Sequence, residues 1–356
     1  PEEIEIEGTL KGTPMIQDLS GNNNHAILRG KPIVTKNEKG QAIVQLREDG
    51  DYIEIPDSES LRVKDGYTAV VGAKVNRLAQ PGEQDHNPLM IKGPSVGWGA
   101  NYLLRIALRN SGIVAFGTCH GITEYAWDGG QANVGKWSQY TSSFDRNNGG
   151  KSYIDKEKVA EIGGISEDSI IRNWEGHPLL IGFSYKGHVH QSIGRPSYFT
   201  HLDADIGQVR FYTEQLTQKE NNEILKNPKK VGPKSDKLAV WLDFDNINTK
   251  GIHTTEWRRP SEFVKSYKLE KQLWEFNTLT ADVKVPGSSS IKAIIQVSDD
   301  MEKVKDSKTI NLKDGQNKID ISDLEKGQYV RVVTEFNSSL TKDATYIPEL
   351  NEYKIS

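Results

Sequence analysis

Over its first two-thirds the chain alternates apolar and polar residues in short runs, separated by glycine, asparagine, aspartate and proline. Alternation with a period of two is typical of strands that bury one face. The pattern predicts strands at residues 52–55, 67–75, 102–108, 112–116, 179–185 and 206–212. Strands of this length and spacing favour a β-sandwich or jelly roll.

One segment departs from this alternation. In residues 216–225 the apolar positions are spaced as on a helix, and Thr217 precedes Glu220 by three residues. That spacing is a capping box, in which each side chain satisfies a backbone N–H of the other residue. We therefore predict one short helix, ended by Asn227 and Pro228.

The organisation into domains follows from a change in composition. Residues 226–237 hold two prolines and a glycine with almost no hydrophobic residues, which is typical of a linker. A second all-β pattern follows, in which Asp314-Gly315 predicts a hairpin turn. We predict an all-β chain with two β-sandwich domains in tandem, a first domain at 1–227, a linker at 228–237 and a second domain at 238–356.

Composition narrows the class of protein. The length of 356 residues suits two domains, and a hydrophobic share of 35% allows each to bury a core. The net charge of −4 is spread along the chain, so we expect neither nucleic-acid binding nor insertion into a membrane. Cys119 is the single cysteine, which excludes an intrachain disulfide. Because the chain opens at Pro1 without a signal-like segment, we expect a piece of a longer protein with upstream domains.

Several motifs of the first two-thirds resemble those of bacterial laminin-G-like, concanavalin A-like jelly rolls. The opening carries DLSGNNNH at Asp18–His25 and YIEIPDSESL at Tyr52–Leu61, and a central hairpin motif runs from Gly135 to Asp155. A closing strand and helix motif covers residues 205–216, so the resemblance extends over about residues 16–227. It implies a laminin-G-like jelly roll with one short C-terminal helix.

The second domain resembles β-sandwich accessory modules of large extracellular bacterial glycosidases. The segments that carry this resemblance are residues 294–300, 319–324 and 327–332. Such modules commonly bind polysaccharide or pack beside it, and the resemblance implies a secreted or cell-surface bacterial protein.

The loop at Asp18–Asn24 is a candidate calcium site. Calcium takes six to eight oxygen ligands, and Asp18, Asn22 and Asn24 offer such oxygens within seven residues. The laminin-G-like resemblance also implies a structural calcium. The alternative is that these side chains only build the turn through hydrogen bonds to the backbone.

Candidate carbohydrate contacts come from aromatic and planar polar side chains. Trp98 and Trp127 lie in glycine-rich segments predicted as loops, where an exposed indole could stack on a sugar ring. Strand alternation places Tyr102 and Arg105 on opposite faces, and we favour Arg105 as the residue that grips an acidic or highly hydroxylated sugar. The remaining candidates are His120, Tyr125, His188 and His190.

Catalysis is the main alternative to binding. Jelly-roll glucanases resembling this fold carry an E-x-D-x-x-E motif on one strand, and no such motif occurs here. His188 and His190 share one face of a predicted strand and could serve a hydrolase or lyase. We therefore predict a non-catalytic carbohydrate-binding or accessory segment of a larger polysaccharide-active enzyme. The alternatives are a jelly-roll hydrolase or lyase and a structural or adhesive cell-surface module.

Overall fold

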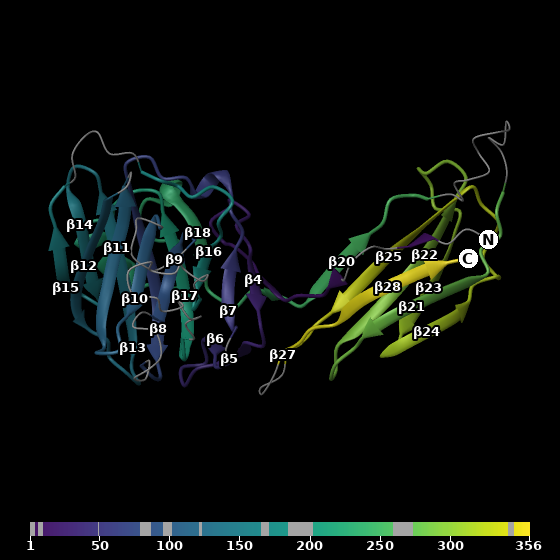
Figure 1. Cartoon of the computed structure of the whole chain (residues 1–356), viewed down its shortest axis with the longest axis horizontal. Helices are drawn as coiled ribbons and strands as arrows, with labels where there is room; N and C mark the ends of the chain where they lie inside the picture. Colours follow the sequence, from purple (N-terminus) through teal and green to yellow (C-terminus); the bar gives the residue numbers. More distant parts are fainter. Residues whose placement is uncertain are drawn as a thin grey trace, which may run out of the picture. The chain divides into compact units, whose positions relative to one another are not determined.

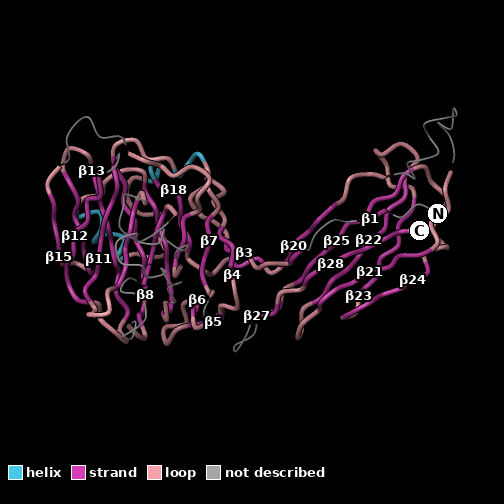
Figure 2. Tube along the Cα trace, in the orientation of Figure 1, coloured by secondary structure: helices cyan, strands magenta, loops and turns pink. Residues whose placement is uncertain are grey.

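The structure is a computed structural model that describes residues 4–5, 10–48, 50–78, 87–94, 102–120, 123–164, 171–183, 202–258, 273–340 and 345–356. They form two compact units. The larger unit is Met15–Ile247, and the smaller unit combines Pro1–Pro14 with Asn248–Leu340 and Thr345–Ser356. Strands dominate both units (Figures 1 and 2), so the prediction of an all-β chain with two β-sandwiches is confirmed.

Two antiparallel sheets stack in the larger unit. The nine-stranded sheet runs in the order β12 (Thr123–Gln131), β11 (Ile113–His120), β10 (Leu104–Leu108), β9 (Asn87–Lys92), β16 (Leu179–Ile181), β7 (Tyr52–Ile55), β4 (Ala26–Arg29), β3 (Met15–Ile16) and β19 (Ile247–Asn248). The eight-stranded sheet runs in the order β15 (Glu157–Ile162), β14 (Gly149–Ile154), β13 (Trp137–Asp145), β8 (Gly66–Val75), β17 (Ala204–Tyr212), β6 (Ala42–Leu46) and β5 (Ile33–Lys36), with β18 (Leu238–Leu242) also beside β17.

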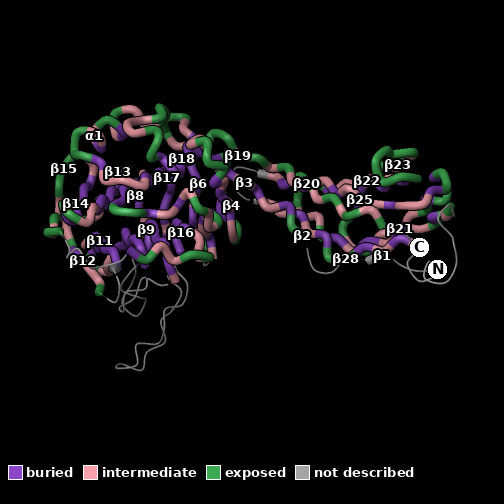
Figure 3. The backbone as a smooth tube through the Cα atoms, turned by 90° about the horizontal axis from the view of Figure 1, so that it is seen from above, coloured by how far each residue is buried: buried purple, intermediate pink, exposed green. Residues whose placement is uncertain are grey.

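The core of the larger unit lies between these sheets. Strand β8 shows how alternate residues of a strand point into this core. Its inward residues belong to one buried hydrophobic cluster: Tyr67, Ala69, Val71, Ala73 and Val75. The intervening residues point to the outer face of the eight-stranded sheet, as alternation requires. Figure 3 shows in purple that the strands of both sheets, such as β8, β9 and β17, hold many buried residues. The alternation of apolar and polar residues in the sequence therefore predicts correctly which face of β8 points into the core.

The predicted helix forms as α1 (Gln218–Lys226) on the outer face of the eight-stranded sheet, beside β13, β17 and β18 (Figure 3). Its capping box is confirmed, because the Thr217 hydroxyl accepts the Glu220 N–H and the Glu220 carboxylate accepts the Thr217 N–H. Ile224 packs on Tyr212 and Trp241. No helix among the described residues is long and apolar enough to cross a membrane.

The predicted linker is wrong. Strand β18 pairs with β17, and the segment before it, including the 3-10 helix Ser235–Lys237, belongs to the larger unit. The buried Arg210 guanidinium donates to the backbone carbonyls of Pro228, Lys230 and Val231, which ties this segment to the sheet. Composition alone indicates a linker here. It does not show that a side chain distant in the sequence, Arg210, satisfies the backbone carbonyls of this segment.

The smaller unit also stacks two main sheets. One orders β1 (Ile4–Glu5), β28 (Glu349–Ile355), β21 (Thr278–Lys284) and β24 (Gly315–Asp320), with β2 (Leu10–Lys11) also on β28. The other orders β20 (Lys250–Thr254), β25 (Tyr329–Asn337), β22 (Ser290–Ser298) and β23 (Asp306–Leu312), and β26 (Ser339–Leu340) pairs with β27 (Thr345–Tyr346). Because β1 and β2 pair with β28, the N-terminal residues belong to this unit and not to the first domain as predicted.

The predicted hairpin at Asp314-Gly315 is also corrected. Strands β23 and β24 flank this turn, but β23 pairs with β22 and β24 pairs with β21. The turn therefore carries the chain from one sheet to the other. The Asp314 carboxylate accepts the Val285 N–H at 2.7 Å, and Gly315 has a φ of 87°, so the local turn chemistry is as predicted.

Candidate functional site

Three of the predicted contact residues, Trp98, His188 and His190, lie outside the described residues, and their roles stay predictions. His120 is the last residue of β11, and its role stays a prediction as well. The structure places the other predicted carbohydrate contacts, Arg105, Tyr125 and Trp127, on the strands of the nine-stranded sheet.

Trp127 is a core residue and not an exposed loop residue, which corrects the prediction. It lies in β12 and is 7% exposed. Its indole spans the space between the sheets, where a Cβ added at Gly150 of β14 would lie 2.7 Å from the ring. Its Nε1 donates to the Ser152 hydroxyl at 2.7 Å. The Trp127 ring therefore does not form the predicted stacking platform. Tyr125, two residues earlier, is half-buried against the same core, and its role in binding stays a prediction.

Arg105 is buried in a polar cluster on the outer face of the nine-stranded sheet. It is 3% exposed. Its guanidinium lies 3.4 Å from the Glu124 carboxylate and 4.8 Å from the centre of the Tyr102 ring. The Tyr102 hydroxyl donates to the same carboxylate. Tyr102 and Arg105 thus meet, and the predicted opposite faces are wrong. The chain bends at Leu103, before β10 begins, so alternation does not run through this point.

The Asp18 loop holds itself and β18 together through hydrogen bonds. The Asp18 carboxylate accepts the N–H groups of Ser20, Asn24 and Trp241 and the hydroxyl of Ser20. Asn24 Oδ1 accepts the Ser58 hydroxyl at 2.6 Å. These oxygens all face donors, so the loop as folded does not fit a directly bound calcium ion. Among the described residues no group of three His, Cys, Asp or Glu is placed to hold a metal.

We expect Asp18→Ala to lower the free energy of unfolding of the larger unit by about 1–3 kcal/mol, because buried N–H groups lose their acceptor. Asn22→Ala, at an exposed position of the same loop, is the matched control and should change it much less. We expect EDTA to leave the melting temperature of the wild type unchanged in calorimetry. A fall on chelation that calcium restores would contradict this expectation and establish the calcium site predicted from the sequence.

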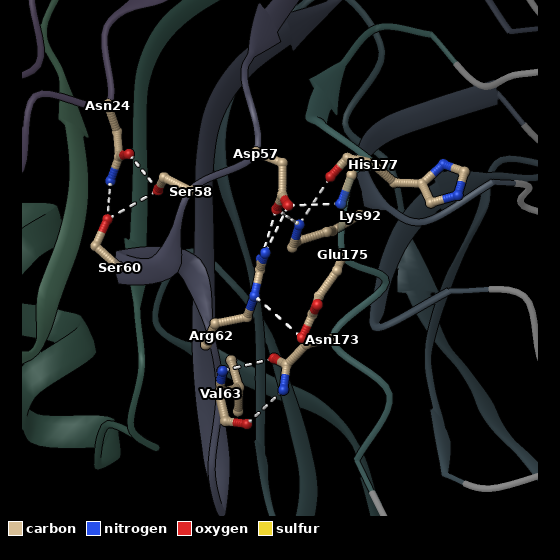
Figure 4. Close-up of polar contacts among 11 residues, drawn as sticks. Asn24, Asp57, Ser58, Ser60, Arg62, Val63, Lys92, Asn173, Glu175 and His177 are labelled. Atoms are coloured by element: carbon tan, nitrogen blue, oxygen red, sulfur yellow. Dashed lines mark hydrogen bonds and ion pairs between the residues drawn. The ribbon is translucent and has the colours of Figure 1, made fainter.

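A second polar cluster joins three segments at the end of β7 and β9 (Figure 4). The Asp57 carboxylate accepts two hydrogen bonds from Arg62, each 2.6 Å, one from Lys92 Nζ at 2.7 Å and one from the Gly176 N–H at 2.6 Å. Lys92 is fully buried, and its Nζ also donates to the His177 carbonyl at 2.8 Å. Asn173 bonds both the N–H and the carbonyl of Val63.

Electrostatics in this Asp57 cluster are dominated by burial and by the hydrogen bonds. Burial alone would raise the pKa of the Asp57 carboxyl, but the donors from Arg62, Lys92 and Gly176 together hold that pKa well below its usual range. Burial lowers the pKa of the Lys92 ammonium, and Asp57 opposes that shift. The four hydrogen bonds of the carboxylate and the bond from Lys92 to the His177 carbonyl join three segments of the larger unit. The cluster therefore serves to fix loops in the larger unit.

The outer face of the eight-stranded sheet carries a groove that the sequence did not single out. Its floor is formed by Gly72, Trp137, Gly207 and Gln208, from β8, β13 and β17. A Cβ at Gly207 would lie 3.0 Å from the Trp137 ring, and a Cβ at Gly72 would lie 2.9 Å from the Gln208 side chain. The two glycines therefore let the indole and the amide lie across neighbouring strands. The register of β17 shifts between Ile206 and Gln208, as in a β-bulge.

An amide chain fixes the polar side of this groove. Gln208 Nε2 donates to Gln139 Oε1 at 3.1 Å, and Gln139 Nε2 donates to Asn221 Oδ1 of α1 at 2.9 Å. Two buried atoms at the groove, Trp137 Nε1 and Gln208 Oε1, have no hydrogen-bond partner among the described residues. An unpaired buried polar atom costs about 1–3 kcal/mol, so such atoms often mark a water or ligand position.

The groove is hollowed by about 230 Å³ beside Gln139 and Gln208, and the half-buried Trp137 lies on its floor. The loop at residues 37–41 and the segment after α1 form the rim. An indole beside fixed amides is the chemistry that binds the apolar face and the hydroxyls of a sugar. We name this feature the Trp137 groove. The sequence signal for it is Gly72 and Gly207, glycines inside strands, which often mark a bulge or close approach.

Stacked antiparallel sheets with a groove on an outer face define the larger unit as a jelly-roll β-sandwich. The family model of the concanavalin A-like lectin/glucanases superfamily, of laminin-G type, matches residues 47–220. The larger unit is therefore a laminin-G-like, concanavalin A-like jelly roll, and the resemblance drawn from the sequence motifs is confirmed. No curated protein sequence matches the chain significantly.

Solved structures with a similar fold are remote. They include a botulinum neurotoxin type C structure, 12% identical with a TM-score of 0.45 over 63% of this chain and 52% of the other. The binding domain of Paraclostridial Mosquitocidal Protein 1 is 13% identical with a TM-score of 0.44 over 61% and 52%. Trypanosoma rangeli sialidase is 14% identical with a TM-score of 0.40 over 62% and 33%. The chain spans about half the length of the first two, and these likenesses define no ligand.

Proposed function

We propose that the larger unit is a non-catalytic carbohydrate-binding module that holds a glycan in the Trp137 groove. The observation that carries the proposal is the placement of an indole beside two fixed amides on an open, glycine-floored sheet face. The superfamily to which the fold belongs includes lectins, which supports this class of ligand.

In the finer form of the proposal, the chain is an accessory segment of a larger secreted or cell-surface bacterial enzyme that acts on polysaccharide. Binding through a tethered module raises the local concentration of the substrate without any chemistry of its own. A hydrolase would need a pair of carboxylates that can act on a glycosidic bond. The neighbouring carboxylates of Asp203 and Asp205 both contact the Arg47 guanidinium, which supports a structural role for them.

The experiment that tests the proposal combines binding and product assays on the intact chain. We expect retention on at least one polysaccharide in pull-down and glycan-array measurements. We expect neither reducing ends nor unsaturated products to be released from that polysaccharide. Product release would favour the hydrolase or lyase alternative, and absence of binding to every glycan would favour a structural or adhesive module.

A further inference from the structure

A second hollow adjoins the Trp137 groove on the same sheet face. It measures about 380 Å³ and is lined by Gln45, Arg47, Lys74, Asn76 and Asp205 among others. The two hollows share Asn37, Glu38, Ile43 and Trp137. The indole therefore stands between two polar compartments, each with its own amides: Gln139 and Gln208 on one side, and Gln45 and Asn76 on the other.

The size of the hollows bears on the length of the ligand. Pockets for small ligands commonly measure about 300–1,000 Å³. The first hollow, about 230 Å³, falls below that range and the second, about 380 Å³, is near its lower end. Both are open rather than enclosed at the sheet surface, so a chain can pass from one to the other across Trp137.

The charges around the two hollows balance one another. The lining holds five basic side chains, Lys36, Lys39, Arg47, Lys74 and Lys229, and four acidic ones, Glu38, Asp155, Asp205 and Asp243. Each acidic group already contacts a donor: Glu38 lies 3.8 Å from Lys74, Asp243 lies 3.9 Å from Lys229, Asp205 pairs with Arg47, and Asp155 accepts the Gln139 N–H at 2.8 Å.

An acidic sugar would need an excess of basic groups to offset the desolvation of its carboxylate. Near-balanced charge does not supply that excess, whereas amides and an indole can bind uncharged rings through hydroxyls and apolar faces. The expectation of an acidic or highly hydroxylated sugar rested on Arg105, a side chain now placed on the other sheet beside Glu124. The charge balance of the Trp137 groove favours the highly hydroxylated, uncharged alternative.

Resting on the proposed function, we infer that the Trp137 groove binds the interior of a neutral oligosaccharide chain. The bound segment has at least two consecutive sugars, and one lies in each hollow, on opposite sides of Trp137. Affinity therefore depends on chain length and not on the charge of the sugar.

Calorimetric titration of the full chain with cello-, manno- and xylo-oligosaccharides, from the monosaccharide to the hexasaccharide, tests this inference. An oligogalacturonate series is the acidic comparison. For at least one neutral series we expect the Kd to fall about tenfold or more between the monosaccharide and the trisaccharide, as each hollow adds its contacts. The Kd should change little with salt, since neutral ligands carry no charge to screen.

Two variants separate the compartments. Gln208→Ala removes an amide that lines only the first hollow, and Gln45→Ala removes one that lines only the second. Each should weaken binding of the trisaccharide and reduce the gain in affinity with length. An affinity that does not change with length, or tighter and salt-dependent binding of oligogalacturonate, overturns the inference and leaves the proposed function in place. Absence of binding to every carbohydrate overturns both.

Discussion

Replacing Asp57 by alanine is expected to lower the free energy of unfolding of the larger unit by about 3–5 kcal/mol, the usual cost of removing one partner of a buried ion pair. The reason is the burial of its partner. Lys92 has no exposed surface, and among the described residues its ammonium would keep only the His177 carbonyl as an acceptor. Arg62 would lose both of its hydrogen bonds to the carboxylate. Urea unfolding followed by circular dichroism measures the change.

Glu54→Gln is the matched control for Asp57→Ala. Glu54 lies three residues earlier and pairs with Arg29 at 2.8 Å, but the Arg29 side chain is 38% exposed. The Glu54 side chain is 15% exposed, so this pair is partly open to water and contributes less than one with a fully buried cation. The control should therefore lower the stability by less than Asp57→Ala does. Equal effects of the two substitutions would contradict the role given to the Asp57 cluster.

The difference in stability between the wild type and the Asp57→Asn variant should depend on pH in a predictable direction. Because the pKa of Asp57 is lower in the folded than in the unfolded protein, its stabilisation is present above the unfolded value of about 4 and is lost as the pH falls below it. The wild type should therefore be more stable than Asp57→Asn at neutral pH, and the difference should shrink in acid. A difference that grows in acid would show that the carboxylate is not held ionised.

Replacing Trp137 by alanine is expected to weaken glycan binding about tenfold or more, by analogy with the 1–3 kcal/mol that one stacked base contributes on an aromatic side chain. The indole is half-buried on the outer face of the sheet and is not part of the buried core between the sheets. We therefore expect the fold to persist, with a modest loss of stability from exposure of Gly207. Titration with a glycan that binds the wild type measures the change in Kd.

Two other tryptophans give the controls for Trp137→Ala. Trp257 of the smaller unit lies under the Arg331 guanidinium at 4.3 Å, and its replacement should leave the Kd unchanged. Trp127→Phe keeps an aromatic ring in the core but removes the donor to Ser152, so it should reduce stability and not binding. If Trp257→Ala weakens binding and Trp137→Ala does not, the glycan site lies in the smaller unit.

Much of the fold could be read from the sequence because it depends on local patterns. The alternation in β7 and β8 placed these strands correctly, and the spacing of Thr217 and Glu220 placed the start of α1. The glycine-rich segment at Trp127 misled the prediction. There β12 is a strand because it pairs with β11, and its glycines only let it approach Val159 and Ala160 of β15 closely.

The sequence by itself determined the inward residues of regular strands such as β8 and the start of α1, because both depend on neighbours a few positions apart. It failed where the chain bends, as at Leu103, and where glycines lie inside a strand, as in β12. Only the tertiary structure decided which outer face is covered and which stays open. Helix α1 and the segment held by Arg210 cover part of the outer face of the eight-stranded sheet, and the Trp137 groove stays open beside them. Such coverage depends on contacts between residues far apart in the chain, such as Gln139 with Asn221, whose partners no local pattern specifies.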